Sequence, residues 1–222
     1  MKQLLKRLLG LAADNPLISQ KAAASVLQPA ENQVEAERQV AAGNTLEDAG
    51  QLTDAETRYR AALKLCPDLA RAHLNLGNIQ AARKQLKEAA ASYREALRLQ
   101  PGYGAAHANL GKLYLGQNNY PNAAEHYAAA VQALPESAEV WVGLGSALEE
   151  LTERRTEAVE AYQRALAIQS GFAGAKLNLG QLLVKLNRHH EAVEYLQDVL
   201  SAMPERGLLV HTLLGQAMIN MG

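Results

Sequence analysis

Histidines and a single cysteine are the side chains of this sequence best suited to catalysis or metal binding. The segment HEAVE, which begins at His190, differs by one residue from the HExxH signature of zinc proteases, because Glu194 replaces the second histidine. His73 and His107 lie 34 residues apart, which puts them too far from each other in stacked units to share a metal. Cys66 has no base beside it in a recognised arrangement. The sequence therefore predicts no enzyme, no metal site and no cofactor.

A short phrase with a central asparagine recurs along the chain. It reads HLNLGNI at 73–79, HANLGKL at 107–113 and KLNLGQL at 176–182. Asparagine costs about 0.5 kcal/mol relative to alanine inside a helix, so its repeated use needs a reason. The side-chain amide carries a donor and an acceptor that can pair with the backbone of an extended peptide, whatever its side chains are. Two interpretations stay open: the asparagines bind a peptide, or tandem duplication copied residues that only face water.

The phrase belongs to a repeat of 34 or 35 residues. A glycine marks the same place in each copy: Gly43, Gly77, Gly111, Gly145 and Gly180. An alanine follows twelve residues later, or thirteen in the fourth copy: Ala55, Ala89, Ala123, Ala158 and Ala192. Four residues beyond the alanine stands a tyrosine, or a leucine in the last copy: Tyr59, Tyr93, Tyr127, Tyr162 and Leu196. A proline, or Ser170 once, closes each copy: Pro67, Pro101, Pro135 and Pro204.

These residue types predict pairs of closely packed helices. Glycine and alanine are needed where two helices cross so closely that a larger side chain would hold the backbones apart, and tyrosine fills the wider gap beside them. Proline cannot continue a helix, so it marks the turn into the next copy. A copy of 34 residues therefore folds as two antiparallel helices, and neighbouring copies stack to form one extended core.

Composition and charge limit the possible functions. The chain has 222 residues with 22 basic and 23 acidic side chains, so no excess of positive charge points to nucleic acid. No apolar run approaches the roughly 18 residues of a membrane-spanning helix. Aromatic residues make up only 5% and strand-type alternation is hard to find, which favours an all-α protein. The single cysteine excludes an internal disulfide and suits a reducing compartment, so we expect a cytoplasmic protein.

The combined pattern resembles the tetratricopeptide repeat (TPR) family. The fourth copy matches the family's motif at the largest number of places: Trp141, Leu144, Gly145, Leu148, Ala158, Tyr162 and Ala165. The resemblance implies a right-handed superhelical solenoid of antiparallel helix pairs, whose first helices line a concave groove. Five repeats are expected over residues 31–204, at about 36–69, 70–103, 104–137, 138–172 and 173–206. Residues 207–222 are expected to form the first helix of a sixth unit or a terminal helix.

The resemblance also implies where a ligand binds. On that geometry the residue two places before each glycine points into the groove, which gives a row of asparagines broken by Ala41 and Gly143. Similar rows line the repeat regions of O-GlcNAc transferases and of related bacterial repeat proteins. The predicted peptide-binding residues are Arg71, Leu74, Asn75, Asn78, Asn109, Lys112, Asn178 and Gln181. The groove has no dominant charge, so the partner expected there is a protein or peptide and not a nucleic acid.

Both ends of the sequence leave alternatives open. Residues 1–30 predict an N-terminal helical pair, either a cap on the repeats or an amphipathic segment that touches a membrane. The tail is apolar on more than one side and stops without a second helix, which indicates either a fragment of a longer protein or a surface for a partner or a second copy. The leading hypothesis is an interaction module for extended peptides. The alternatives are the recognition arm of a larger glycosyltransferase or methyltransferase, and a self-associating or membrane-proximal scaffold.

Overall fold

The computed structural model describes residues 16–221, with side chains from residue 28 onward. The described residues form α-helices and two short 3-10 helices, and they contain no strand. The chain divides into two compact bodies, one ending at Leu99 and one beginning at Gln100.

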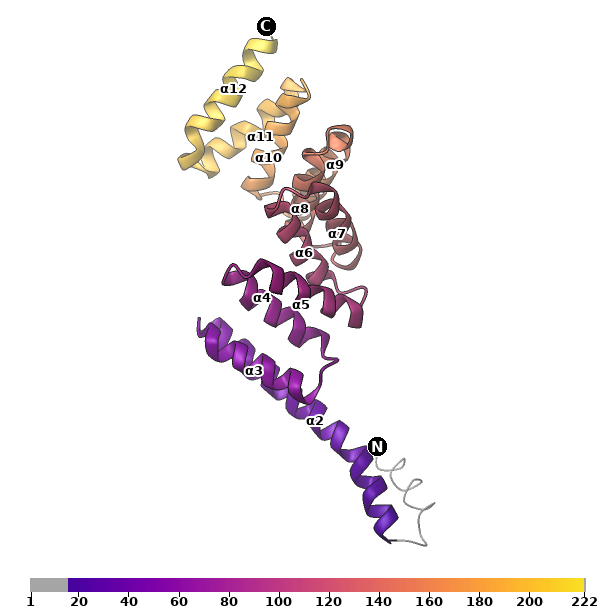
Figure 1. Ribbon diagram of the computed structural model, residues 1–222. Coiled ribbons are helices and arrows are strands. Elements are labelled where there is room, and N and C mark those ends of the chain that lie inside the picture. The colour runs from indigo at the N-terminus through magenta and orange to yellow at the C-terminus, as the bar shows by residue number, and fades with distance from the viewer. Residues whose placement is uncertain (1–15, 222) are drawn as a thin grey trace. The chain divides into compact units, whose positions relative to one another are not determined.

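The N-terminal body is built from four helices: α2 (Pro16–Asp48), α3 (Leu52–Leu65), α4 (Ala70–Ala82) and α5 (Leu86–Leu99). Helix α2 pairs with α3, α4 pairs with α5, and α3 packs on α4. Figure 1 shows α2 running well past α3, in keeping with its 33 residues against 14. No break marks the expected boundary at residue 30, since α2 continues through Pro29. The first half of the predicted N-terminal pair, residues 1–15, lies outside the described residues.

The C-terminal body contains three helix pairs and a last single helix. They are α6 (Gly104–Gly116) and α7 (Tyr120–Ala133), α8 (Ala138–Glu149) and α9 (Arg155–Ile168), α10 (Ala173–Lys185) and α11 (His189–Ala202), and α12 (Gly207–Met221). Successive pairs pack through α7 on α8, α9 on α10 and α11 on α12, as the order of colours in Figure 1 also shows. The short helices η1 (Thr152–Arg154) and η2 (Pro204–Arg206) join α8 to α9 and α11 to α12. The residue inserted in the fourth repeat is thus accommodated in η1.

Each repeat glycine lies where the two helices of its pair cross. A Cβ built on Gly145 would stand 2.7 Å from Cε1 of Tyr162, and one on Gly111 would stand 2.8 Å from Cδ2 of Tyr127. In the last pair Leu196 takes the tyrosine's place, with its Cδ2 at 2.7 Å from a Cβ on Gly180. No real side chain tolerates such distances, so the prediction that glycine permits the close crossing is confirmed.

The turn inside most pairs uses a left-handed residue. Lys84, Asn118 and Asn187 have φ values of 61°, 57° and 58°, and Gly50 has 74°. The next backbone N–H bonds to a carbonyl five residues earlier, for example Gln85 N to Gln80 O at 2.9 Å. This is the Schellman closure of a helix, which reverses the chain in very few residues. It lets the second helix start almost at once and return along the first.

Candidate binding site

Two asparagines of the recurring phrase, Asn75 and Asn178, face the tyrosine of the preceding repeat. In the N-terminal body, Asn75 of α4 is half-buried, and its Nδ2 donates to Oδ1 of Asn44 in α2 at 2.7 Å. The Tyr59 hydroxyl lies 2.9 Å from the same Oδ1 and donates to Oε2 of Glu47 at 2.6 Å. These polar groups tie the first repeat to the second through hydrogen bonds that only the folded arrangement creates.

The hydroxyl of Tyr59 is electrostatically perturbed by this cluster. Burial is the largest cause that raises its pKa, and the Glu47 carboxylate raises it further because an ionised phenol would face a like charge. The Asn75 amide acts in the opposite direction by donating toward the hydroxyl oxygen. Tyr59 therefore stays neutral and keeps the cluster intact over the whole physiological range.

The C-terminal body repeats the arrangement with different partners. The Tyr162 hydroxyl lies 3.0 Å from Oε2 of Glu149 and 3.2 Å from Oγ of Ser146. Burial is again the largest cause that raises the pKa of Tyr162, while Asn178 of α10 acts to lower it. At the equivalent place in α8 stands Gly143, and a Cβ there would overlap the ring of Tyr127. Asn75 and Asn178 therefore have a structural role, which sequence analysis did not weigh.

The other predicted site residues differ in their exposure. Arg71 and Lys112 are exposed to solvent, and Asn109 is half-buried on α6. Leu74 is only 7% exposed, so it presents little surface to a ligand. Asn78 accepts a hydrogen bond from the Tyr93 hydroxyl at 3.1 Å.

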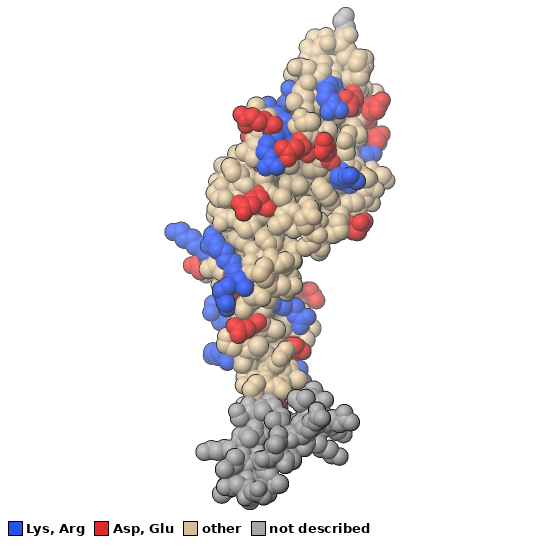
Figure 2. Space-filling view, turned by 90° about the vertical axis from the view of Figure 1, so that its right-hand side faces the viewer, with Lys and Arg blue, Asp and Glu red and all other residues tan. Residues whose placement is uncertain are grey.

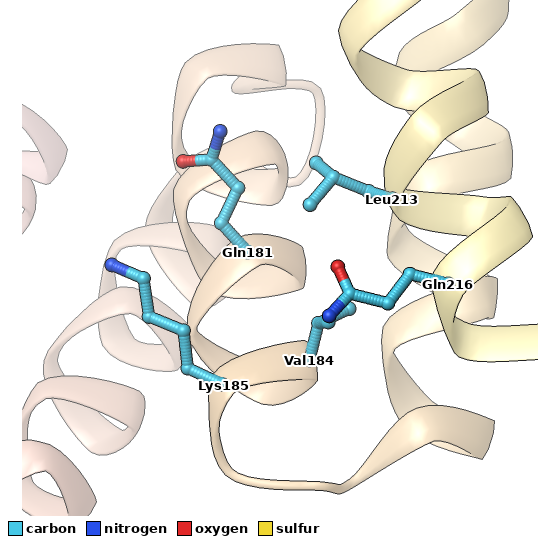
Figure 3. Close-up of a pocket in the computed structure, with 5 residues that line it drawn as sticks. All are labelled: Gln181, Val184, Lys185, Leu213 and Gln216. Carbon is cyan, nitrogen blue, oxygen red and sulfur yellow. The ribbon is translucent and has the colours of Figure 1, made fainter. Parts of the chain in front are cut away.

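Gln181 lines a pocket between α10 and α12. The cavity measures about 280 Å³, and its lining is Gln181, Val184, Lys185, Leu213 and Gln216. Figure 3 shows Leu213 and Gln216 extending from α12 toward α10, which carries the other three side chains. The sequence offered a signal for Gln216 that we did not use: Gln181 and Gln216 each follow their repeat glycine by one residue.

A buried acid anchors the lysine of this pocket. Nζ of Lys185 lies 2.6 Å from Oε1 of Glu149, whose other carboxylate oxygen accepts from Tyr162. Glu149 is buried and sits on α8, so the ion pair joins the fourth repeat to the fifth. Because its charge is matched, Lys185 adds little net charge to the pocket.

The recurring histidines are structural. Nε2 of His73 lies 2.8 Å from the carbonyl oxygen of Pro67, and Nε2 of His107 lies 3.0 Å from that of Pro101. Trp141, at the equivalent place of the fourth repeat, donates from Nε1 to the proline carbonyl six residues before it at 2.8 Å. A ring N–H at this place thus holds the turn that leads into each of these repeats.

His107 also contacts a second histidine that sequence analysis did not connect with it. Nδ1 of His107 and Nδ1 of His126 are 3.0 Å apart, and the His126 ring stacks on Tyr114 with centroids 5.5 Å apart. One imidazole nitrogen must carry the proton and the other must accept it. No cluster of three or more metal-ligating side chains exists within the described residues.

The HEAVE segment lies in the first part of α11. Ala192 is fully buried in the helix-pair core, whereas His190 and Glu194 are exposed. The neighbouring His189 is buried at the start of α11, and its Nδ1 has no hydrogen-bond partner among the described residues. Cys66 is a half-buried free thiol at the end of α3.

Comparison with known proteins agrees with the repeat geometry. Sequence models of the tetratricopeptide repeat match residues 40–104 and 109–174, which is more than half of the chain, and another matches residues 151–217. The chain belongs to the tetratricopeptide repeat family. This TPR chain is 35% identical over 74 residues to a peroxisomal targeting signal receptor of Candida albicans. The matched segment is 33% of this chain and 12% of the receptor.

Solved TPR structures share the fold. YrrB, described as a TPR protein with an unusual peptide-binding site, superposes with a TM-score of 0.70 at 23% identity, covering 86% of this chain and 96% of YrrB. PilF of Pseudomonas aeruginosa gives 0.73 at 22% identity, covering 86% and 87%. MamA gives 0.66 at 21% identity, covering 74% and 95%. These likenesses confirm the predicted fold class, an all-α solenoid of antiparallel helix pairs.

None of the described helices combines the length and the apolar character needed to cross a membrane. Helix α2 has 33 residues, but polar and charged side chains are spread along it.

Proposed function

We propose that this TPR protein binds an extended segment of a partner protein in the pocket between α10 and α12. Membership of the family implies a protein–protein interaction module, because stacked repeats build long surfaces for partners. The observation that supports this particular place is the convergence of two amides and two apolar side chains from neighbouring first helices.

The lining suits a peptide better than a small molecule. Gln181 and Gln216 each offer a donor and an acceptor that match the C=O and N–H of an extended backbone. Val184 and Leu213 form an apolar wall for one side chain. A volume of about 280 Å³ is at the low end for a drug-sized ligand, but it accommodates one side chain with its adjacent backbone. Because the charge of Lys185 is paired with Glu149, the pocket favours a neutral side chain of the peptide.

The remaining predicted residues lie on first helices of both bodies. The amides of Asn75, Asn109 and Asn178 are half-buried, so each keeps some contact with solvent. A side-chain amide can make up to four hydrogen bonds, so an internal partner need not use all of its capacity. Lys112 supplies an exposed positive charge in the body that holds the pocket, and Arg71 supplies one in the N-terminal body, each suited to an acidic residue of a partner.

The surface chemistry supports a protein partner over a nucleic acid. Figure 2 shows one face on which basic and acidic side chains are intermixed, with wide areas that carry neither charge. Nucleic-acid binding draws on a continuous basic surface that neutralises several phosphates. Because the single cysteine suits a reducing compartment, we propose that this binding function operates in the cytoplasm.

Peptide selection with matched variants tests the proposal. Peptides that bind this chain are selected from a random phage library. Fluorescence anisotropy then compares their affinity for the parent chain with that for the double variant Gln181→Ala/Gln216→Ala. The control is Gln163→Ala/Gln197→Ala, which removes two exposed amides from second helices. We expect the pocket variant to weaken binding at least about tenfold and the control to leave it unchanged.

A second variant tests the asparagines separately. Replacing Asn75, Asn109 and Asn178 together by alanine is expected to weaken the same peptides, with circular dichroism confirming that the helices remain. If both this variant and the pocket variant bind the peptides as the parent chain does, the first-helix surface is not the peptide site.

A further inference from the structure

The repeat tyrosines bond through their hydroxyls to first-helix side chains at two fixed places. The first place follows the repeat glycine by one residue, and the hydroxyls of Tyr59, Tyr93 and Tyr162 lie 2.9, 3.1 and 3.2 Å from the side-chain oxygens of Asn44, Asn78 and Ser146 there. The second place follows the glycine by four residues and holds an acid in two repeats, Glu47 and Glu149. Each of these three hydroxyls thus has an oxygen beside it in its own repeat.

The third repeat has no acceptor at either place. Lys112 follows its glycine by one residue and Leu115 by four. An ammonium group carries three donors and no acceptor, and a leucine side chain has neither. Gly143 of α8 stands where the other repeats that follow a tyrosine have asparagine. The hydroxyl of Tyr127 accordingly has no hydrogen-bond partner among the described residues.

This unpartnered hydroxyl reaches solvent. The ring of Tyr127 packs against Gly143, where an added Cβ would stand 2.4 Å from Cζ, the carbon that carries the hydroxyl. Tyr127 is 6% exposed, whereas Tyr59 and Tyr162 are 0% exposed. Among the described residues, Nδ1 of His189 is the only side-chain polar atom that is fully buried without a partner, so the Tyr127 oxygen must touch solvent. Burial raises the pKa of Tyr127 to about 12, so the hydroxyl keeps the proton that it can donate.

Lys112 adds a positive charge that no acid of the described chain neutralises. Its side chain is exposed, and helix α6 contains no Asp or Glu. The other lysines on first helices of this body, Lys176 and Lys185, are paired with Asp198 and Glu149. The third repeat therefore offers an unmatched cation on its first helix.

We propose that Lys112 and Tyr127 form a subsite for the carboxylate of an Asp or Glu side chain in the extended segment of a partner protein. The repeat register places the two side chains together, because the residue after the glycine contacts the tyrosine hydroxyl in three other repeats. Two donors that lack an acceptor match the two oxygens of a carboxylate, and one ammonium matches its single charge. A phosphate group has nearly two charges and is typically bound by arginines, which α6, α7 and α8 do not contain.

The subsite rests on the proposed capture of a protein segment, but it does not depend on the pocket between α10 and α12. Both lie in the C-terminal body, where they select different side chains. The pocket favours a neutral residue, and Lys112 with Tyr127 favours an acidic one.

Two substitutions remove the subsite without removing an internal bond. Lys112→Gln deletes an exposed charge, and Tyr127→Phe deletes a hydroxyl that has no partner, so the urea midpoint is expected to stay at the parent value. The matched control is Arg164→Gln/Tyr195→Phe, which deletes the same two groups from α9 and α11 of the same body.

Phage selection with random peptides is run on four proteins: the parent chain, the subsite variant Lys112→Gln/Tyr127→Phe, the control, and the pocket variant Gln181→Ala/Gln216→Ala. We expect an Asp or Glu to be enriched at one place of the peptides selected on every protein except the subsite variant. One such peptide is then synthesised with an amidated C-terminus. Replacing its acidic residue by the corresponding amide is expected to weaken binding to the parent chain about fivefold or more and to leave binding to the subsite variant unchanged.

The two proposals can fail separately. Unchanged affinity of the pocket variant, with the acidic preference retained, would refute the pocket and support the subsite. Peptides without an acidic preference on the parent chain, or with the same preference on the subsite variant, would overturn the subsite. Binding that requires a free C-terminal carboxylate would also overturn it, because the ligand would then be a chain terminus. A lower urea midpoint for Tyr127→Phe would do the same, since the hydroxyl would then have an internal partner.

Discussion

Substituting alanine for one repeat glycine tests whether close helix crossing holds the array together. In Gly145→Ala the new Cβ would stand 2.7 Å from Cε1 and 2.8 Å from Cδ1 of Tyr162. Tyr162 is fully buried, and its hydroxyl is held at Glu149 and Ser146, so the ring cannot swing away. Overpacking of this kind costs about 1–3 kcal/mol. Alanine returns about 1 kcal/mol of helix propensity, which leaves a net loss of about 0–2 kcal/mol.

The same substitution at Gly215 provides the matched control. Nothing lies within 4 Å of a Cβ there, so only the propensity gain remains and Gly215→Ala is expected to be stabilising by up to about 1 kcal/mol. Urea unfolding followed by far-UV circular dichroism measures both. In a Tyr162→Ala background the cost of Gly145→Ala is expected to vanish, because the two residues are in contact. Equal stabilisation by the two alanine substitutions would show that the ring yields and would refute the reasoning.

Three further predictions concern polar groups. Burial raises the pKa of Tyr93 and of Tyr127 to about 12, so the folded state favours their neutral forms. Their contribution to the free energy of unfolding is complete below the unfolded pKa of about 10 and is expected to fall as pH rises from about 10 toward 12. Urea titrations at a series of alkaline pH values measure this fall. Trp141→Phe removes the ring N–H that holds a proline carbonyl and is expected to lower the free energy of unfolding by about 0.5–1.5 kcal/mol, whereas an unchanged urea midpoint would mean that water replaces the bond without cost. Lys185→Ala leaves the Glu149 carboxylate without its cation, and because the lysine is half-exposed, the expected loss in the free energy of unfolding is about 0.5–1 kcal/mol, measured as a lower urea midpoint. Added salt is expected to lower the midpoint of the parent chain and to leave that of the variant unchanged.

The helix pairs could be read from the sequence because their spacing has one physical interpretation. Gly111 and Tyr127 recur with a fixed separation in repeat after repeat, and only a close antiparallel crossing uses a small and a large residue in that way. The expected boundary near residue 30 is not seen, because α2 runs through Pro29 without a break. A lone proline removes only part of the hydrogen bonding of a long helix, so it marks a boundary less reliably than a pattern that recurs five times.

The candidate site was only partly predictable. Gln181 was found from its place beside a repeat glycine, but the pocket also needs Leu213 and Gln216 from a helix for which no peptide contact was predicted. The partners of Asn75 and His107 lie on other helices, at Asn44 and His126. A contact between helices depends on how each is rotated about its axis, and composition and spacing leave that rotation open.

By itself, the amino-acid sequence determined the family, the helix pairs and the glycine register, because a repeated pattern of small and large residues needs no knowledge of neighbours. The tertiary structure decided which polar groups find partners and which surfaces stay open. Gly180 and Gly215 look alike in the sequence, but one is covered by Leu196 and the other is bare. The reason is that a residue's burial is set by what packs against it from elsewhere in space, and α12 has no second helix of the described chain above its glycine.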